Sequence, residues 1–413
     1  MKPRLNFMYL HSPHIGYGYQ GVATHKAFER IGIDVFDGLP GSGDLDIKQK
    51  NSAICNDVLF LSTPTHVRGW WSHQRAHLFT MWEGTSLPEA MRESLHNFKT
   101  VVVPSEHCLE LFSRYHKNVH YVPLGVDSER WAYTPRRQGT FFNFLVSGSG
   151  PRKGADLARR AFHAVFGNFA GDGPIPRLVI KDPRGHERPG PSIDVISGYL
   201  HPDEEVQLYA DAHCFLAPSR GEGWGMQPLQ AIAQGIPTIL TDAHGHRSFS
   251  RFGLPISSSF AKSDYFLFGD AGDWWEPDFD ALCDRMKWVY EHYDFESYQA
   301  KVNAHVVARR FTWENSADQI VKSIGGYTRL SEDTRHEGVW RDVECQKFEL
   351  ITTRDWRADI AGVTHVFKKG ATYMVSADVK RVLFEGGALD PACLKDGAGL
   401  ASEQLARIGE VYA

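Results

Sequence analysis

Short apolar runs alternate with amphipathic segments along the first 130 or so residues of the chain. The runs at 5–11, 57–62, 77–83 and 100–105 are short and apolar, whereas 21–32 repeats apolar residues at helical spacing. Because strand and helix alternate, the pattern predicts a parallel sheet with crossover helices.

The same alternation begins again after residues 124–140, where Pro, Gly and Arg interrupt the periodicity. The second series predicts strands and helices at 142–148, 154–166, 177–182, 193–200, 203–212, 213–219, 228–235 and 237–242. The chain therefore reads as two doubly wound α/β units in tandem. Ligands of such units bind outside the carboxyl ends of the strands, so two facing units create a deep cleft.

The length of 413 residues also favours more than one domain, because a single hydrophobic core rarely supports a chain of this size. We expect Rossmann-like α/β domains over residues 1–135 and 136–328. Residues 329–413 differ in character, and their short strands, turns and one closing helix predict a small α+β module of unknown role.

Composition limits the location and the partners. The formal net charge of −5 gives no global basic surface of the kind that polyanion-binding proteins often carry. The six cysteines are scattered without a C-x-x-C pair, which is typical of a reduced protein. No signal-peptide core is present and no apolar run approaches about 18 residues, so we expect a cytoplasmic protein without a transmembrane segment.

The stretch SRGEGWGMQPLQAIAQGIPTIL, residues 219–240, places a carboxylate among three glycines before an apolar helix. The glycines permit tight turns and the close approach of a ligand, and Pro228 suits the first turn of the helix. A helix N-terminus has free N–H groups and a dipole that favour phosphate oxygens. A phosphate would repel Glu222, so we expect its carboxylate to contact something else, such as sugar hydroxyls.

Several further motifs occur in order: VVVPSEHCLELF, VHYVPLGVDSERW, GPRKGADLARRAF, ISGYLHPDEEVQLYADAHCFLAPSRGEGWG and AIAQGIPTILTD. Together they make residues 1–325 similar to the retaining glycosyltransferases of family four, which have the two-domain GT-B fold and a signature of two Glu separated by seven residues. The resemblance implies that Glu222 contacts the sugar of a UDP- or GDP-linked donor, that the first domain binds the acceptor, and that no metal or other cofactor is required. The second Glu of the signature is Gln230 here, a neutral partner whose hydrogen bonds to ribose hydroxyls are weaker.

Arg152 and Lys153 follow a predicted strand and precede a helix, where they can point into the cleft at a diphosphate leaving group. The alternative is a pair of solvated cations, although the helix dipole disfavours cations at that end. Members of the resembling family usually carry an earlier Arg in this loop, and residues 147–150 contain none. We therefore expect Arg152 and Lys153 to do more of the phosphate binding.

Three segments are predicted to bind the donor. Gly16 and Gly18 follow the first strand, where glycines either let the backbone approach the phosphates or serve packing only. Base recognition is expected from the backbone of residues 197–200, which include Gly198, Tyr199 and Leu200, and from nearby loops. The resemblance also implies that the donor is bound by the loop residues Gly223, Trp224, Gly225 and Met226.

Two predictions concern the acceptor. Glu83 follows a buried strand next to Trp82, and it is either a general base for the acceptor hydroxyl or a capping or salt-bridged residue. Cations and aromatic rings are mixed over residues 66–78, which is typical of a surface that stacks bases, of a sugar-ring platform, or of a partly buried helix. The acceptor-binding residues predicted in this segment are Arg68, Trp70, Trp71 and His73.

Residues 44–46, Asp-Leu-Asp, look like the metal-binding carboxylate pair of the other glycosyltransferase fold, but they lie in a Gly-rich stretch. We therefore predict a solvated turn there and no metal site.

These features predict an enzyme that transfers a sugar, with retention, from a nucleotide diphosphate sugar to an acceptor hydroxyl. The aromatic cluster and the C-terminal module favour a hydroxymethylated base in duplex DNA as the acceptor, as in phage-type modifying glycosyltransferases, although the acidic net charge argues against DNA. A glycan or lipid-linked acceptor is the alternative. The alternatives of other classes are a catalytically weakened sugar-nucleotide-binding protein and a GT-B epimerase or phosphorylase.

Overall fold

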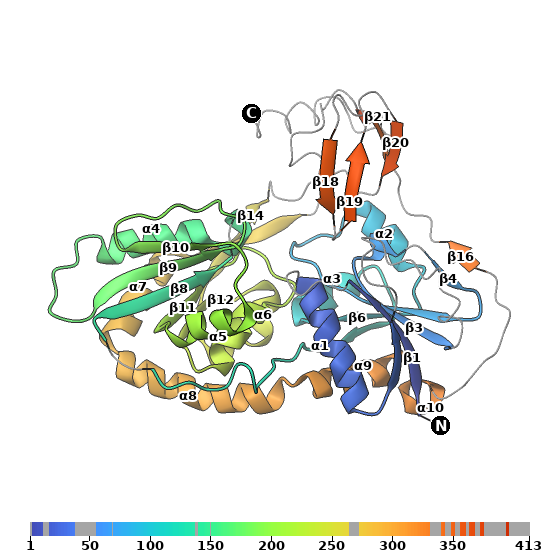
Figure 1. The fold of residues 1–413 in the computed structure, drawn as a ribbon, viewed down its shortest axis with the longest axis horizontal. Coiled ribbons are helices and arrows are strands. Elements are labelled where there is room, and N and C mark those ends of the chain that lie inside the picture. Colours follow the sequence, from blue (N-terminus) through green and yellow to red (C-terminus); the bar gives the residue numbers. More distant parts are fainter. Residues whose placement is uncertain are drawn as a thin grey trace.

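The computed structural model contains two α/β units side by side (Figure 1). It describes residues 2–10, 16–37, 55–67, 69–136, 139–148, 150–263 and 272–330, together with the backbone of six short strands between 340 and 395. Each unit is built on a six-stranded parallel sheet, so the predicted pair of doubly wound domains is confirmed.

The first sheet has the strand order β2-β1-β3-β5-β6-β7. Its strands are β1 (Arg4–Tyr9), β2 (Asp34–Asp37), β3 (Asp57–Leu61), β5 (Arg75–Phe79), β6 (Thr100–Val103) and β7 (Val119–Tyr121). The connecting helices are α1 (Gly16–Arg30), α2 (Glu89–Leu95) and α3 (Glu106–Phe112). Because successive side chains of a strand point to opposite faces, Leu59 and Phe60 of β3 enter two different hydrophobic clusters, and both are fully buried.

The second sheet has the order β10-β9-β8-β11-β12-β13. Its strands are β8 (Phe141–Ser147), β9 (Ile175–Asp182), β10 (Ile193–Ser197), β11 (Cys214–Ala217), β12 (Thr238–Thr241) and β13 (Leu254–Ile256). Its helices are α4 (Ala155–Phe166), α5 (Pro202–Ala210) and α6 (Met226–Ala233), with short 3₁₀ turns η3 (Pro151–Lys153), η4 (His244–Ser248) and η5 (Ser250–Phe252). This order is that of the Rossmann fold.

Each sheet has one position where the chain reverses its direction of winding. In the first sheet this switch point lies between β1 and β3, and in the second it lies between β8 and β11. In open parallel sheets a crevice forms there, outside the carboxyl ends of the strands. The loops that leave β8 and β11 include residues 150–154 and 219–225, so the fold brings two of the predicted donor-binding segments to one place.

The chain returns to the first unit through its last helices. These are α7 (Phe279–Glu291), α8 (Tyr293–Arg310), α9 (Trp313–Ile324) and α10 (Gly326–Leu330). Helix α9 packs along α1, and the N–H of Val126 donates to the carbonyl of Phe311 at 2.8 Å. A Cβ on Gly125 would lie 2.4 Å from the backbone nitrogen of Trp313, so only glycine permits this close crossing. The domain boundaries inferred from the sequence stay predictions.

Three further features complete the described chain. The antiparallel hairpin β14–β15 (Ser258–Lys262 and Asp273–Pro277) follows β13, and β4 (Gly69–Trp71) pairs with β16 (Trp340–Asp342). The other C-terminal strands are β17 (Phe348–Ile351), β18 (Trp356–Ile360), β19 (Val363–Phe367), β20 (Thr372–Val375) and β21 (Leu394–Lys395). The closing helix predicted for this module and the Asp-Leu-Asp turn at 44–46 lie outside the described residues.

The described cysteines, Cys55, Cys108, Cys214 and Cys283, are free thiols. Among the helices that the structure describes, none has the length and apolar character needed to cross a membrane.

Candidate functional site

Four predicted site residues meet between the two sheets. The 3₁₀ turn η3, directly after β8, carries Arg152 and Lys153, and the loop after β11 carries Glu222. Glu83 comes from the first unit, in the loop after β5. Since β8 and β11 flank the switch point of the second sheet, the fold predicts that three of these side chains share one crevice.

Ion pairs join the four side chains. Lys153 Nζ lies 2.7 Å from Glu222 Oε1, and Arg152 Nη1 lies 3.2 Å from Glu222 Oε2. The same Arg152 nitrogen lies 3.9 Å from Glu83 Oε1 and donates to the carbonyl of Gly221 at 2.7 Å. Arg152 therefore links a carboxylate of the first unit with a carboxylate of the second, and the cluster contains two positive and two negative groups.

The cluster is mostly removed from water, which shifts its pKa values. Burial alone raises the pKa of the Glu222 carboxyl, but the charges of Lys153 and Arg152 outweigh burial and hold this pKa well below its ordinary value. Burial lowers the pKa of the Lys153 ammonium, and Glu222 opposes that effect. Burial also lowers the pKa of the neighbouring His246 to about 4. At neutral pH, Glu222 is thus ionised and His246 is neutral.

Two glycines let the loop of Glu222 lie directly on the first unit. A Cβ on Gly221 would lie 2.5 Å from the carbonyl oxygen of Glu83, and one on Gly223 would lie 2.6 Å from the side chain of Met81. Contacts this short do not occur for real side chains, so glycine is required at both positions in this arrangement. The glycines predicted to let a ligand approach therefore also let the two units approach each other.

The third glycine of this loop starts helix α6. Gly225 is the N-cap of α6 and has φ of 107°, a left-handed conformation that favours glycine. A Cβ there would also lie 2.4 Å from His246. Pro228 lies in the first turn of α6, as predicted, where its missing N–H leaves no hydrogen bond unmade.

Gln227, in the first turn of α6, is a site residue that the sequence reasoning missed. Its Nε2 donates to Ser147 Oγ at 3.0 Å, and its Oε1 accepts from Lys153 Nζ at 3.3 Å. It therefore holds the ammonium against the end of β8. A polar side chain next to Pro228, in the first turn of a mostly apolar helix, was the signal that could have identified it.

The remaining donor-binding predictions fall in three places. Gly16 and Gly18 lie in the first helical turn of α1 and not in the loop between β1 and α1. A Cβ on Gly16 would lie 3.7 Å from Met226 Cε. Gly198, with φ of 84°, and the exposed Tyr199 follow β10, with Leu200 directly after them. Strand β10 lies two strands from β8, about 10 Å across the sheet, which suits the distance between a base and its diphosphate.

Gln230, in the position of the second signature Glu, lies on α6 and is buried. It borders the hydroxyl of Tyr19 from α1, whose pKa is raised by burial. The amide therefore lies where the two units meet.

Two aromatic residues predicted at the site have buried side chains. Trp224 is 1% exposed and packs on Phe249 and Phe311, so its ring belongs to the core and only its backbone can face a donor. Trp70 is 7% exposed and packs on Phe60 and Phe98 inside the first unit. A ring in that position cannot stack on a base or a sugar.

The other three predicted acceptor-binding residues are Trp71, His73 and Arg68. Trp71 lies in β4, so the segment is a strand rather than a helix, and His73 follows in the turn toward β5. Arg68 lies outside the described residues. No cluster of His, Cys, Asp or Glu that could hold a metal ion occurs in the parts of the chain described.

Arg220 is a second residue that the sequence reasoning missed. It is 6% exposed and its guanidinium pairs with both Asp156 and Glu276, with Nη contacts to each at 2.9 Å. It also donates to the carbonyl of Pro151, and its backbone N–H donates to the carbonyl of Arg152 at 2.8 Å. Arg220 therefore fixes η3 relative to the loop of Glu222.

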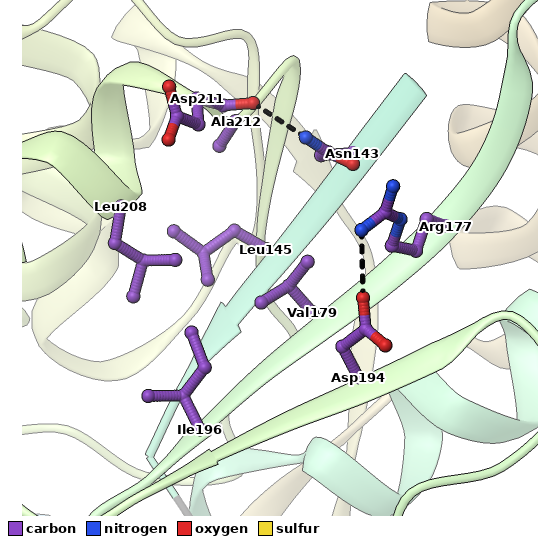
Figure 2. A pocket seen from close by; sticks show the side chains of 9 residues that line it. All are labelled: Asn143, Leu145, Arg177, Val179, Asp194, Ile196, Leu208, Asp211 and Ala212. Carbon is purple, nitrogen blue, oxygen red and sulfur yellow. Dashed lines mark hydrogen bonds and ion pairs between the residues drawn. The ribbon is translucent and has the colours of Figure 1, made fainter. Parts of the chain in front are cut away.

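A separate cavity of about 280 Å³ lies away from this cluster (Figure 2). Leu145, Val179, Ile196 and Leu208 point into it, and the ion pair of Arg177 with Asp194 borders it. The lining side chains come from β8, β9, β10 and the end of α5, and none of them belongs to the cluster, which lies in loops beyond the strands. The cavity is therefore not part of the candidate site.

Replacing Arg220 by Ala should lower the free energy of unfolding by about 2–3 kcal/mol, because charge-assisted hydrogen bonds to two carboxylates are lost from a buried guanidinium. Urea unfolding at pH 7 measures this. Arg177→Ala is the matched control, since it removes an exposed ion pair worth less than about 1 kcal/mol. Equal losses in the two variants would show that Arg220 is not a structural clamp.

Stability should fall as the pH falls from 7 to 5. Burial lowers the pKa of His107 and of His246 to about 4, below the ordinary 6.5, so the unfolded chain takes up protons first. Each histidine then costs about 2 kcal/mol of unfolding free energy at pH 5. Urea unfolding at pH 7 and pH 5 measures this loss. His107→Gln and His246→Gln should each make the loss of unfolding free energy between the two pH values smaller by about 2 kcal/mol. The exposed His96→Gln is the control, and an equal pH dependence in all three variants would contradict the assignment.

Comparisons with known proteins find similar glycosyltransferases. Putative glycosyltransferase 41 of Sulfolobus islandicus filamentous virus is 42% identical over 57 residues, which are 14% of this chain and 17% of that protein. Mannosylfructose-phosphate synthase of Agrobacterium fabrum is 28% identical over 148 residues, 35% of this chain and 29% of that protein. The chain thus spans less than a third of the length of either relative.

The fold is shared more widely than the sequence. The structure of sucrose-phosphate synthase from Thermosynechococcus elongatus superposes with a TM-score of 0.55 and 14% identity, over 78% of this chain and 98% of that chain. This likeness confirms the GT-B fold. A model of the family described as family 4 glycosyltransferase in conflict systems matches residues 103–320, more than half of the 413 residues. The chain therefore belongs to the family 4 glycosyltransferases found in conflict systems.

Proposed function

We propose that this protein is a retaining, metal-independent glycosyltransferase that moves a sugar from a nucleotide diphosphate sugar to a hydroxyl of a glycan or a lipid-linked acceptor. One observation carries the proposal: Arg152 and Lys153, both partly buried, pair with the buried Glu222 between two facing nucleotide-binding folds. Such folds place a diphosphate at the switch point, where the cations and the N-terminus of α6 can stabilise the charge on the leaving group. The donor is UDP- or GDP-linked, and a cytoplasmic location stays a prediction.

The reaction assigns a step to each residue. The bond between the anomeric carbon and the diphosphate oxygen breaks, and its electron pair leaves with the diphosphate, held by Arg152 and Lys153. The acceptor oxygen bonds to the same face of the anomeric carbon and gives its proton to Glu83. Before this, the donor phosphates compete with Glu222 for the two cations. The carboxylate released in this exchange is then available to accept hydrogen bonds from the sugar hydroxyls.

A carbohydrate acceptor has better support than DNA. The main reason to expect stacked DNA bases was the aromatic cluster, and Trp70 of that cluster is buried in the core. The net charge of −5 also disfavours a polyanion. The name mannosylfructose-phosphate synthase describes a relative that forms a disaccharide phosphate, which is in keeping with a sugar acceptor.

Removal of the cluster side chains should abolish transfer. We expect Lys153→Ala to lower turnover about 100-fold or more, the usual effect of removing one group that stabilises developing charge. Glu222→Ala should also lower turnover, because the sugar hydroxyls lose their carboxylate partner. The measurement is nucleoside diphosphate release from a panel of UDP- and GDP-sugars, with and without oligosaccharide acceptors. Lys287→Ala, at a 64% exposed side chain on α7, is the matched control and should turn over like the wild type.

Two outcomes would contradict the proposal. Full activity of Lys153→Ala would remove the assigned phosphate contact. A wild-type protein that gains thermal stability from a donor but never releases the nucleoside diphosphate would instead be a sugar-nucleotide-binding protein.

Closure of the two units should depend on Gly221. The new Cβ of Gly221→Ala overlaps the carbonyl of Glu83, and relief of such overpacking costs about 1–3 kcal/mol. Turnover should fall about tenfold or more, because the closed arrangement becomes less populated. Gly139→Ala is the control, since nothing lies within 4 Å of a Cβ there. Equal turnover of both variants would show that reaction does not use this contact.

A further inference from the structure

The hairpin β14–β15 bridges the two units beside the cluster. The N–H of Thr85, in the first unit, donates to the carbonyl of Asp273 at 3.0 Å, and the N–H of Asp273 donates back to Thr85 Oγ1 at 2.7 Å. On the other side, the N–H of Trp275 donates to the carbonyl of Arg220 at 2.8 Å. Strand β15 is therefore hydrogen-bonded to both units.

Both anchor points lie close to the candidate catalytic carboxylates. Thr85 is two residues after Glu83, and Arg220 is two residues before Glu222. The hairpin therefore contacts the loops that carry both carboxylates. Neither the ion-pair cluster nor the proposed donor contacts use this hairpin.

One face of the hairpin is aromatic. Phe260 and Trp275 are cross-strand partners, so both rings are on the same face, with centroids 5.8 Å apart and an interplanar angle of 48°. Trp275 is fixed by edge contacts to His107 of the first unit at 4.9 Å and to His244 of the second at 5.5 Å. Phe260 is 68% exposed. The result is an indole held in place, with an open phenyl ring beside it.

We propose that Phe260 and Trp275 form the acceptor platform and bind the apolar C–H face of a pyranose ring, so that the acceptor is a neutral carbohydrate. This inference rests on the proposed function. Aromatic rings that are fixed in a cleft supply contact area without losing side-chain freedom, and neighbouring polar groups orient the ligand. The charges of the hairpin are balanced, because Asp273 is the cross-strand partner of Lys262 and Glu276 pairs with Arg220, so no excess charge favours an ionic ligand over a neutral sugar.

Direct binding tests the platform without turnover. Saturation-transfer NMR of the full chain is recorded with maltotriose, with chitotriose, and with tetraethylene glycol, which has hydroxyls but no ring. The wild type should transfer saturation to the ring C–H protons of one trisaccharide and not to the glycol. Phe260→Ala should weaken that binding about fivefold or more, and Phe260→Trp should restore it. Phe295→Ala, at a 58% exposed ring on α8, is the matched control and should bind like the wild type.

A kinetic split adds a second readout. With an oligosaccharide acceptor, Phe260→Ala should raise the acceptor KM more than it lowers kcat. Trisaccharide binding by Phe260→Ala equal to that of the wild type overturns the platform. So does an equal loss in Phe295→Ala, or a change from oligomer to monomer in Phe260→Ala, which would assign the ring to contact with a second copy. Failure of the proposed function looks different: no donor is turned over, whatever the trisaccharides do.

Discussion

The pairing of Lys153 and Arg152 with Glu222 is the interaction on which the arrangement of the site depends. An isolated charge of either sign would be costly in so enclosed a position, and each group is tolerated because the others are present. The ion pairs connect η3 with the loop after β11, and through Glu83 they reach the first unit. The same contacts that neutralise the charges thus fix the relative position of three loops.

A second layer of contacts keeps these loops in place. Arg220 ties η3 to the loop of Glu222 and, through Glu276, to the hairpin β14–β15. Gly221 and Gly223 allow the loop to touch the first unit without a gap. Since rigid packing transmits small displacements, a shift of the hairpin would displace Arg152 through the contacts of Glu276 and Arg220. The hairpin is therefore placed to couple the proposed acceptor platform to the two cations of the cluster.

The architecture and the central cluster followed from the sequence because both have local signals. Alternating apolar and amphipathic segments predicted the two sheets, and a strand followed by Arg152 and Lys153 placed cations at a switch point. The burial of the Trp70 and Trp224 side chains could not be predicted in this way. An aromatic residue among polar neighbours gives the same pattern whether its ring is exposed or buried by a distant segment.

Long-range packing explains the other differences. Helix α9 rests on α1, and the crossing at Gly125 depends on residues almost 190 positions apart, which no window of sequence reveals. The hairpin β14–β15 was missed because its strands are short and mix Ser, Asp and Lys with aromatic residues. Arg220 was visible in the glycine-rich stretch, but its two carboxylate partners are 64 and 56 residues away.

The balance of charge in the cluster gives a physical order to the proposed reaction. With two cations and two carboxylates, the site is neutral before a donor enters, so it carries no excess positive charge that would attract any anion alike. A diphosphate gains the cations only by displacing Glu222. The displaced carboxylate is buried, and its ionised form then needs new hydrogen-bond donors, which the hydroxyls of a sugar can supply and inorganic diphosphate cannot. Selection for a donor that carries a sugar thus follows from the cost of leaving Glu222 without a partner.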